Sequence, residues 1–172
     1  MVSSAVKKYA ALCMVCLCSS LFFLDLYQFN NKYSQNTIQA ANGILALSEE
    51  ELQKSPVRFL VSGWAFYPDA LLTPEEIQDE SHYMRYLSIG EQTNFSSPAN
   101  PSPYGCGTYQ MTFFLPERKE TYALEIPEVF SAYNLYLDHD LILQLGEPAQ
   151  GKPLVQNRMV TFHGGKPVTL TI

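Results

Sequence analysis

Basic residues are few in this chain. Its 172 residues include 11 Lys and Arg against 17 Asp and Glu, so the formal net charge is −6 and the sequence pI is about 5.0. Nucleic-acid binding depends on lysine and arginine side chains that neutralise phosphates. The composition therefore argues against a nucleic-acid partner.

Cysteine is almost absent beyond the first 20 residues. Cys13, Cys16 and Cys18 lie in one apolar run. Cys106 is the one cysteine after them, so no disulfide can form among the residues that follow Cys18. The Cys13-x-x-Cys16 spacing occurs in metal and redox sites, but this run contains no His and no second Cys pair. We interpret these thiols as small apolar residues of a membrane helix and predict no cofactor.

Catalytic motifs are also missing. The chain has three histidines, none with a Gly-x-Ser-x-Gly partner: His82, His139 and His163. A glycosidase needs two carboxylates that face each other across a cleft. We interpret Asp138 and Asp140 as solvated acids of a hairpin turn, and Glu75 and Glu76 as charges at a helix start. The sequence therefore predicts that this chain is not an enzyme.

Three potential metal ligands lie in a row at Asp138-His139-Asp140. Alternate residues of a strand face opposite ways, so the three side chains cannot all converge on one ion. We predict no metal site there, although Ca²⁺ held by backbone carbonyls would leave no sequence pattern.

An uncharged run covers residues 9–24, with Lys7 and Lys8 before it and Asp25 after it. Its length falls between a signal-peptide core of about 7–15 residues and a spanning helix of about 20. No small-x-small cleavage site follows, so we predict an uncleaved signal anchor over residues 1–29, with a cleaved signal as the alternative. The flanking charges place the N-terminus in the cytoplasm, which predicts a single-pass protein of the cell membrane with its C-terminal domain extracytoplasmic.

Residues 30–55 are polar and weakly patterned, and we interpret them as a juxtamembrane spacer. Within it, the Ser48 to Glu51 spacing fits a capping box and predicts a short helical turn. The folded domain is expected over residues 56–172.

Short strand-like runs separated by turn residues fill that domain, at a spacing that favours a β-sandwich or barrel. Strands or alternating runs are expected at 57–61, 64–68, 83–89, 108–115, 121–126, 134–137, 141–145, 158–162 and 167–172. Thr73-Pro74 predicts a brief helix, and residues 90–106 form a long loop. The last strand reaches Ile172 and is expected to leave an uncovered sheet edge, so we expect a fragment of a longer protein.

Five stretches carry a family resemblance through their order and spacing. They are Gly63-Trp64-Ala65-Phe66-Tyr67-Pro68, Leu71-Leu72-Thr73-Pro74-Glu75-Glu76, Gly90-Glu91 with Asn94-Phe95-Ser96, residues 104–109, and residues 131–137. They resemble the extracellular galactose-binding-like jelly roll that precedes bacterial seven-transmembrane receptors with diverse intracellular signalling modules. The resemblance covers about residues 56–172.

The resemblance implies an all-β, galactose-binding-like jelly-roll sandwich that continues beyond Ile172. It also implies a sensor whose kinase or cyclase output lies outside this chain. Where the family hairpin carries Asn-Gly, this chain has Asp138-His139-Asp140, which is unfavourable for a tight type I′ turn.

Aromatic residues make up 13% of the chain and supply the candidate ligand site. The faces of Trp64, Tyr67, Tyr104 and Tyr133 can stack on a sugar ring, and Arg158 can donate to a sugar hydroxyl or carboxylate. Alternatives are a core position for Trp64 and a solvated strand charge at Arg158. Tyr104 is the strongest candidate, because its loop is rich in proline and because the glycines at 105 and 107 would let the main chain approach a ligand.

The leading hypothesis is a membrane-anchored extracytoplasmic sensor or carbohydrate-binding module at the front of a bacterial signal-transduction receptor. Its expected partners are a small carbohydrate, the membrane through the N-terminal helix, and missing signalling modules or a receptor. One alternative is a structural domain that holds a partner protein and binds no small ligand. Another is the accessory sugar-binding domain of a glycosidase.

Overall fold

An apolar helix forms the first of the two units into which the chain divides, Met1–Asn36 and Thr37–Ile172. The computed structural model describes residues 4–30, 38–79, 81–89, 95, 102, 104–119 and 121–172. Helix α1 covers Ser4–Asn30, and its stretch Ala5–Phe29 has a mean hydropathy of 2.0. By length and composition, α1 is long and apolar enough to cross a membrane.

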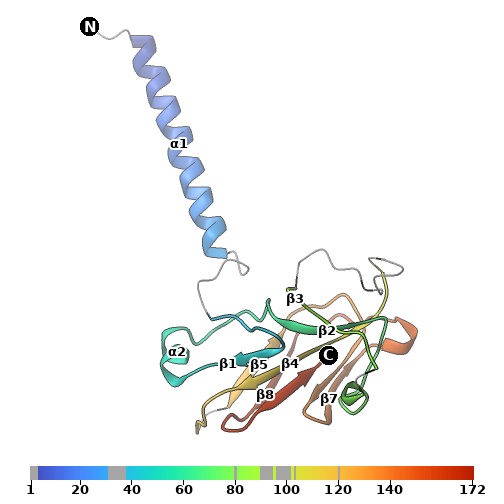
Figure 1. Ribbon diagram of the computed structural model, residues 1–172. Coiled ribbons are helices and arrows are strands. Elements are labelled where there is room, and N and C mark those ends of the chain that lie inside the picture. The colour runs from blue at the N-terminus through green and yellow to red at the C-terminus, as the bar shows by residue number, and fades with distance from the viewer. Residues whose placement is uncertain are drawn as a thin grey trace. The chain divides into compact units, whose positions relative to one another are not determined.

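The second unit is mostly antiparallel β-sheet, as the sequence predicts (Figure 1). A seven-stranded sheet runs in the order β3-β2-β4-β9-β6-β7, and β1 pairs with β4 in parallel. Its strands are β1 (Ile44–Ala46), β2 (Trp64–Pro68), β3 (Arg85–Leu87), β4 (Gly107–Phe114), β6 (Tyr133–Leu137), β7 (Asp140–Leu145) and β9 (Val168–Thr171). A smaller sheet pairs β5 (Tyr122–Ile126) with β8 (Arg158–Phe162). Three short helical segments complete the unit: α2 (Glu49–Lys54), η1 (Glu76–Gln78) and η2 (Pro148–Gln150).

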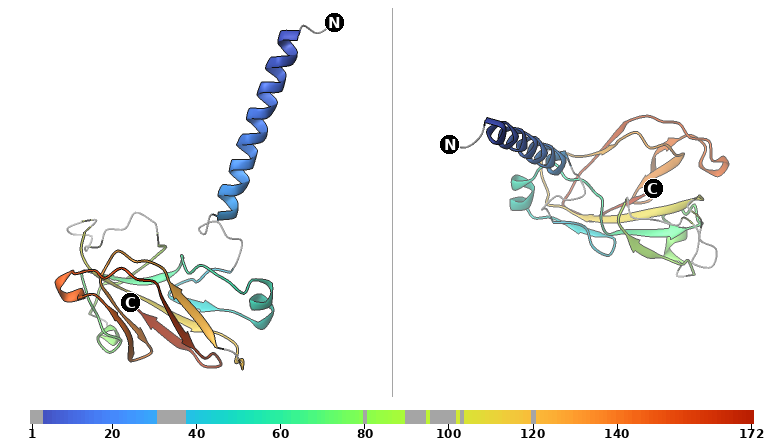
Figure 2. Two further views of the ribbon diagram at one scale, coloured as in Figure 1. Left: turned by 180° about the vertical axis from the view of Figure 1, so that it is seen from behind. Right: turned by 90° about the horizontal axis from the view of Figure 1, so that it is seen from above.

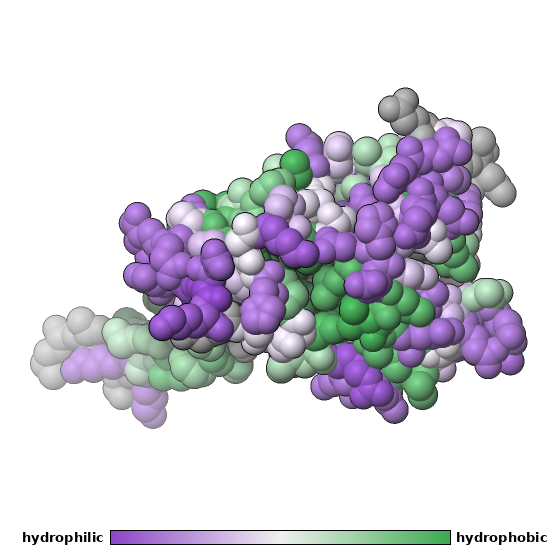
Figure 3. Space-filling view, turned by 90° about the horizontal axis from the view of Figure 1, so that it is seen from below, coloured by the Kyte–Doolittle hydropathy of each residue, from purple (hydrophilic) through white to green (hydrophobic). Residues whose placement is uncertain are grey.

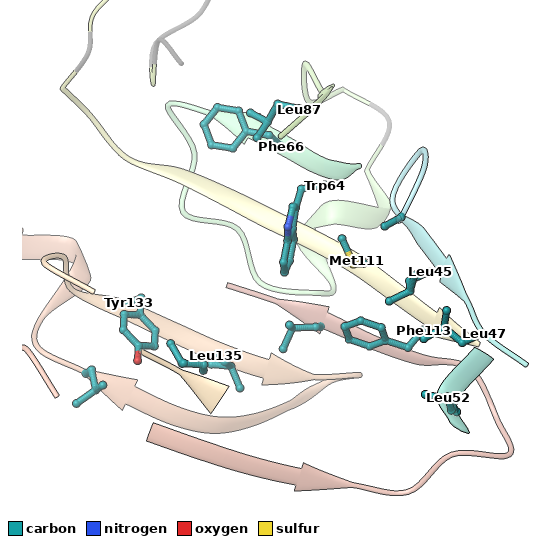
Figure 4. Packing of buried hydrophobic residues seen from close by; sticks show 14 residues of the cluster. Leu45, Leu47, Leu52, Trp64, Phe66, Leu87, Met111, Phe113, Tyr133 and Leu135 are labelled. Carbon is teal, nitrogen blue, oxygen red and sulfur yellow. The ribbon is translucent and has the colours of Figure 1, made fainter. Parts of the chain in front are cut away.

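The small sheet packs against one face of the large sheet (Figure 2). Phe113 of β4 stacks on Phe162 of β8 with ring centroids 5.8 Å apart, and Tyr122 of β5 stacks on the same ring at 5.9 Å. Side chains from β2, β4 and β6 converge in the core between the sheets (Figure 4). Phe66, Met111, Leu135 and Leu170 are fully buried there. Each such side chain contributes roughly 1.5–3 kcal/mol of transfer free energy.

The opposite face of the large sheet, here called the outer face, is polar. Thr108, Gln110 and Thr112 alternate with the core residues of β4. The register of β4 with β9 places Gln110 beside Thr171 and Thr112 beside Thr169. The period of two in a strand thus produces an apolar inner face and a row of hydroxyl and amide side chains outside.

Part of the expected spacer belongs to the folded unit. Residues 44–46 pair with β4, and Leu52 of α2 lies in the core at 7% exposure. The capping box is confirmed, because the Ser48 side chain accepts from the Glu51 backbone N–H and Glu51 accepts from that of Ser48. The sheet therefore begins before residue 56.

Two strand expectations need correction. Residues 57–61 form no strand; instead the Arg58 guanidinium donates to the backbone oxygens of Glu51 and Ile38. The expected strand 83–89 is limited to β3, three residues long. Outside β3, the Ile89 N–H donates to the Val61 carbonyl and so joins the ends of these two segments.

The last strand does not leave an uncovered edge. β9 lies between β4 and β6 and hydrogen-bonds to both. The strands β3, β7 and the short β1 lie at edges of the large sheet, and β7 carries a register shift opposite Leu135 and Tyr136. A bulge of this kind protects an edge from pairing with another chain.

The β6–β7 turn has two central residues, Asp138 and His139, because Leu137 pairs with Asp140. Of these two, Asp138 alone has a positive φ, at 55°. A type I′ turn requires positive φ at both central positions, so the turn is of another type, as the absence of glycine indicates.

Candidate functional site

A groove of about 470 Å³ opens on the outer face of the large sheet. Its floor comes from β4 and β9, one wall from the segment 74–78 that includes η1, and the other wall from the β6–β7 turn. Figures 1 and 2 show η1 beside that hairpin. The polar lining residues are Gln78, Gln110, Thr112, Asp138, His139 and Thr169, and the apolar ones are Pro74, Ile77 and Pro167.

The floor is a set of hydroxyl and amide groups. The Oγ1 atoms of Thr112 and Thr169 lie 3.0 Å apart and share one hydrogen bond. The Gln110 amide donates to Thr171 Oγ1 at 3.4 Å. A hydroxyl has one donor and two acceptor sites, and a glutamine amide has two of each. The floor therefore keeps donors and acceptors that a ligand can use.

The segment that forms the first wall is attached to β4 through Thr108. The Thr108 hydroxyl donates to the Ala70 carbonyl and accepts from the Leu72 backbone N–H, both at 2.8 Å. Beyond it, the Glu76 carboxylate accepts from the Thr73 N–H at 2.8 Å, and the Thr73 hydroxyl accepts from the Glu76 N–H at 3.4 Å. The expected helix start is thus the single 3-10 turn η1, and reciprocal hydrogen bonds between Thr73 and Glu76 hold the residues that lead into it.

The second wall is held by Asp138. Its Oδ1 accepts from the Thr169 backbone N–H at 2.9 Å, and its own N–H donates to the Thr169 carbonyl at 2.7 Å. Its Oδ2 lies 3.9 Å from Lys166 Nζ. Asp138 is an acid of the hairpin turn, as the sequence predicts, and its side chain is 40% exposed. Its hydrogen bond to the Thr169 N–H also fixes the carboxylate at the rim of the groove.

A hydrogen bond joins the two walls. His139 Nδ1 donates to Glu75 Oε1 at 2.9 Å. The pKa of Glu75 lies below its usual value because its own backbone N–H and then His139 donate to the carboxylate. Both side chains are about three-fifths exposed, so solvent screens this pair and it contributes little to stability.

The predicted ligand residues do not form one surface. Tyr104 is exposed, as expected, at 84% of its surface. Trp64 and Tyr133 lie in the core at 3% and 7%, so neither ring face is open to a sugar. Tyr67 is buried at 9%, and its register with Thr108 places it on the outer face.

Arg158 is exposed at the start of β8, on the same strand face as Val160 and Phe162, and its guanidinium donates to the side chain of Gln156. Burial raises the pKa of the Tyr133 phenol, and the positive charge of Arg158 opposes that rise. These two residues are near each other, but the Tyr133 side chain belongs to the inner face. The rest of the expected loop site, residues 90–94, 96–101 and 103, lies outside the described residues.

The groove residues were not identified from the sequence, although one signal for them was visible. Alternation in residues 108–115 separates Thr108, Gln110 and Thr112 from the apolar positions. A row of hydroxyl and amide side chains on one face of a long strand is a signal for a ligand-binding site on that face. The other lining residues come from segments far apart in the sequence, and pairing them requires the sheet order.

Among the residues described, no three His, Cys, Asp or Glu side chains lie close enough together to hold a metal ion. Comparisons with protein-family models, with curated proteins and with solved structures gave no match for this chain. The argument about function therefore depends on the chemistry of the groove.

Proposed function

We propose that this chain is a membrane-anchored, extracytoplasmic module that binds a carbohydrate in the groove between η1 and the β6–β7 turn. The observation that carries the proposal is the groove lining: four uncharged hydrogen-bonding side chains, Gln78, Gln110, Thr112 and Thr169, beside three apolar residues. Sugar hydroxyls both donate and accept, as threonine hydroxyls and glutamine amides do together.

The size and walls of the groove also support a sugar. Its volume of about 470 Å³ falls within the range of about 300–1,000 Å³ typical of small-molecule sites. Pro74, Ile77 and Pro167 offer apolar contacts for the C–H groups of a pyranose. A sugar would therefore find hydrogen-bond partners on the floor and apolar contacts at the sides.

The wider assignment is part of the same proposal. We interpret the two facing sheets as a jelly roll of the galactose-binding-like type and α1 as its membrane anchor. The module would then serve at the front of a bacterial receptor, with any kinase or cyclase output elsewhere. The facing antiparallel sheets and the apolar helix α1 support this interpretation.

A glycan array on the full chain in detergent micelles tests the binding. Thr112→Val keeps the side-chain shape and removes a floor hydroxyl, so we expect sugar affinity to fall about fivefold, the effect of a hydrogen bond of about 1 kcal/mol. Tyr104→Ala is the comparison, because the sequence predicts a loss of roughly 1–2 kcal/mol there. A loss of sugar affinity in Tyr104→Ala, with unchanged affinity in Thr112→Val, would place the site at the loop. No binding to any sugar would refute the proposal.

A second candidate function is a contact surface for a partner protein. Apolar side chains gather in one area of the face shown in Figure 3. Phe130 and Met159 are 82% and 67% exposed, unusually open for large apolar side chains. Cross-linking in native membranes tests this function: a specific partner lost in Phe130→Ser, together with a flat glycan array, would favour it.

A further inference from the structure

The groove has an uneven charge. Asp138 is its one lining carboxylate, and neither Lys nor Arg is among the lining residues that the structure describes. His139, the remaining ionisable lining residue, is hydrogen-bonded to the carboxylate of Glu75. Asp140 follows in the same turn. A ligand in the groove therefore meets more negative than positive charge.

The Asp138 carboxylate has one oxygen engaged and one available. Oδ1 accepts the Thr169 N–H, which fixes the carboxylate in place. Oδ2 lies 3.9 Å from Lys166 Nζ, beyond hydrogen-bond distance. The Lys166 side chain is 74% exposed and long, so an incoming cation can displace it at small cost. Oδ2 can thus accept from a ligand at the rim while the floor hydroxyls bind the rest of the ligand.

We propose that the groove selects a hydroxyl-rich ligand bearing a protonated amine, such as an amino sugar, over an acidic one, and that Asp138 determines this selectivity by pairing with the ammonium. This inference rests on the proposed function, since it names the ligand class of the same groove. An ammonium about 4 Å from Oδ2 gains about 1 kcal/mol in bulk water and more at a partly buried rim, whereas a carboxylate there is repelled. The matched amino sugar should therefore bind at least about fivefold more tightly than the neutral sugar.

Asp138→Asn isolates the charge. The asparagine oxygen can still accept the Thr169 N–H, and Asn tolerates the positive φ of 55° that Asp138 adopts. Asp140→Asn is the control, because Asp140 is a neighbouring acid of the same turn that does not line the groove. The two variants have the same net charge and differ in the placement of the lost carboxylate.

Calorimetry on the full chain in micelles, with length-matched oligosaccharides of glucose, glucosamine and glucuronic acid, tests the proposal. The expected order is glucosamine, then glucose, then glucuronic acid. Asp138→Asn should remove the glucosamine preference, so that glucosamine binds no more tightly than glucose in this variant, and Asp140→Asn should keep the order. Equal affinities for all three sugars, or a preference that survives in Asp138→Asn, would overturn this inference and leave the proposed function standing. Absence of binding by any of the three would refute both.

Discussion

Gly107 leaves room for the ring of Phe66. A Cβ atom at position 107 would lie 2.4 Å from Cε2 and 2.6 Å from Cζ of that ring. Phe66 is fully buried and lies 4.7 Å, centroid to centroid, from Tyr109. The sequence interpretation of Gly107 as a point of close approach to a ligand is therefore replaced by core packing.

Gly107→Ala should lower the free energy of unfolding by about 1–3 kcal/mol, the usual cost of overpacking a core. Urea denaturation measures it. Because the clash is with one ring, Phe66→Leu in the same chain should recover part of the loss, so the two changes should be non-additive. Strictly additive effects would mean that the glycine matters for another reason.

Thr108→Val should destabilise the folded unit by about 1–3 kcal/mol, because the Leu72 N–H and the Ala70 carbonyl lose their shared partner at a site 2% exposed. Thermal melts compare it with Thr161→Val, an exposed position of β8 that should change stability by less than about 0.5 kcal/mol. Equal effects at the two positions would show that the hydroxyl of Thr108 does not hold the wall segment.

Stability should fall above pH 10. Burial raises the pKa of Tyr67, Tyr109, Tyr122 and Tyr133 above the ordinary value of 10.0. The unfolded chain then loses phenolic protons at a lower pH than the folded chain, so the stabilisation is complete below pH 10 and is lost as the pH rises through the folded-state values. Denaturant unfolding at a series of alkaline pH values, with tyrosinate absorbance as a second readout, measures this.

Tyr133→Phe gives that experiment its control. The Tyr133 hydroxyl is buried without a hydrogen-bond partner among the described residues, so phenylalanine keeps the packing and removes a titrating group. The alkaline loss of stability should become smaller in this variant. An unchanged pH slope would show that Tyr133 does not contribute to it.

Residues 5–29 should remain attached and keep the chain in the membrane fraction after alkaline carbonate extraction. N-terminal sequencing of the purified membrane protein checks this, and a variant starting at residue 31 should appear in the soluble fraction. A mature terminus between residues 20 and 40 would instead indicate a cleaved signal peptide.

Local patterns in the sequence predict most of the strands. The alternation in 108–115 corresponds to β4, and 141–145 and 158–162 correspond to β7 and β8 within one residue. β1 has three residues and is stabilised by parallel pairing with a distant strand, so it carries no period of its own. The run 57–61 resembles a strand in sequence, but it forms none, and its Arg58 side chain donates to the carbonyls of Ile38 and Glu51.

The groove could not be predicted for the same physical reason. Gln78, Gln110 and Thr169 come together because β9 enters the sheet beside β4 and because the segment around η1 folds over both. Neither of these long-range arrangements produces a local sequence pattern. The aromatic residues were conspicuous in composition, but the period of two places Trp64 and Tyr133 inside.

The central position of β9 has a consequence for how the protein is made. Thr112 and Thr169 are 57 positions apart, and among the described strands β9 alone connects the β6–β7 hairpin to β4. On the ribosome, the two halves of the sheet must wait as separate pieces until residues 168–171 emerge from the exit tunnel, which predicts slow, late closure. The floor of the groove includes Thr169 of the same strand, so a nascent chain cannot form the groove before β9 has paired with β4.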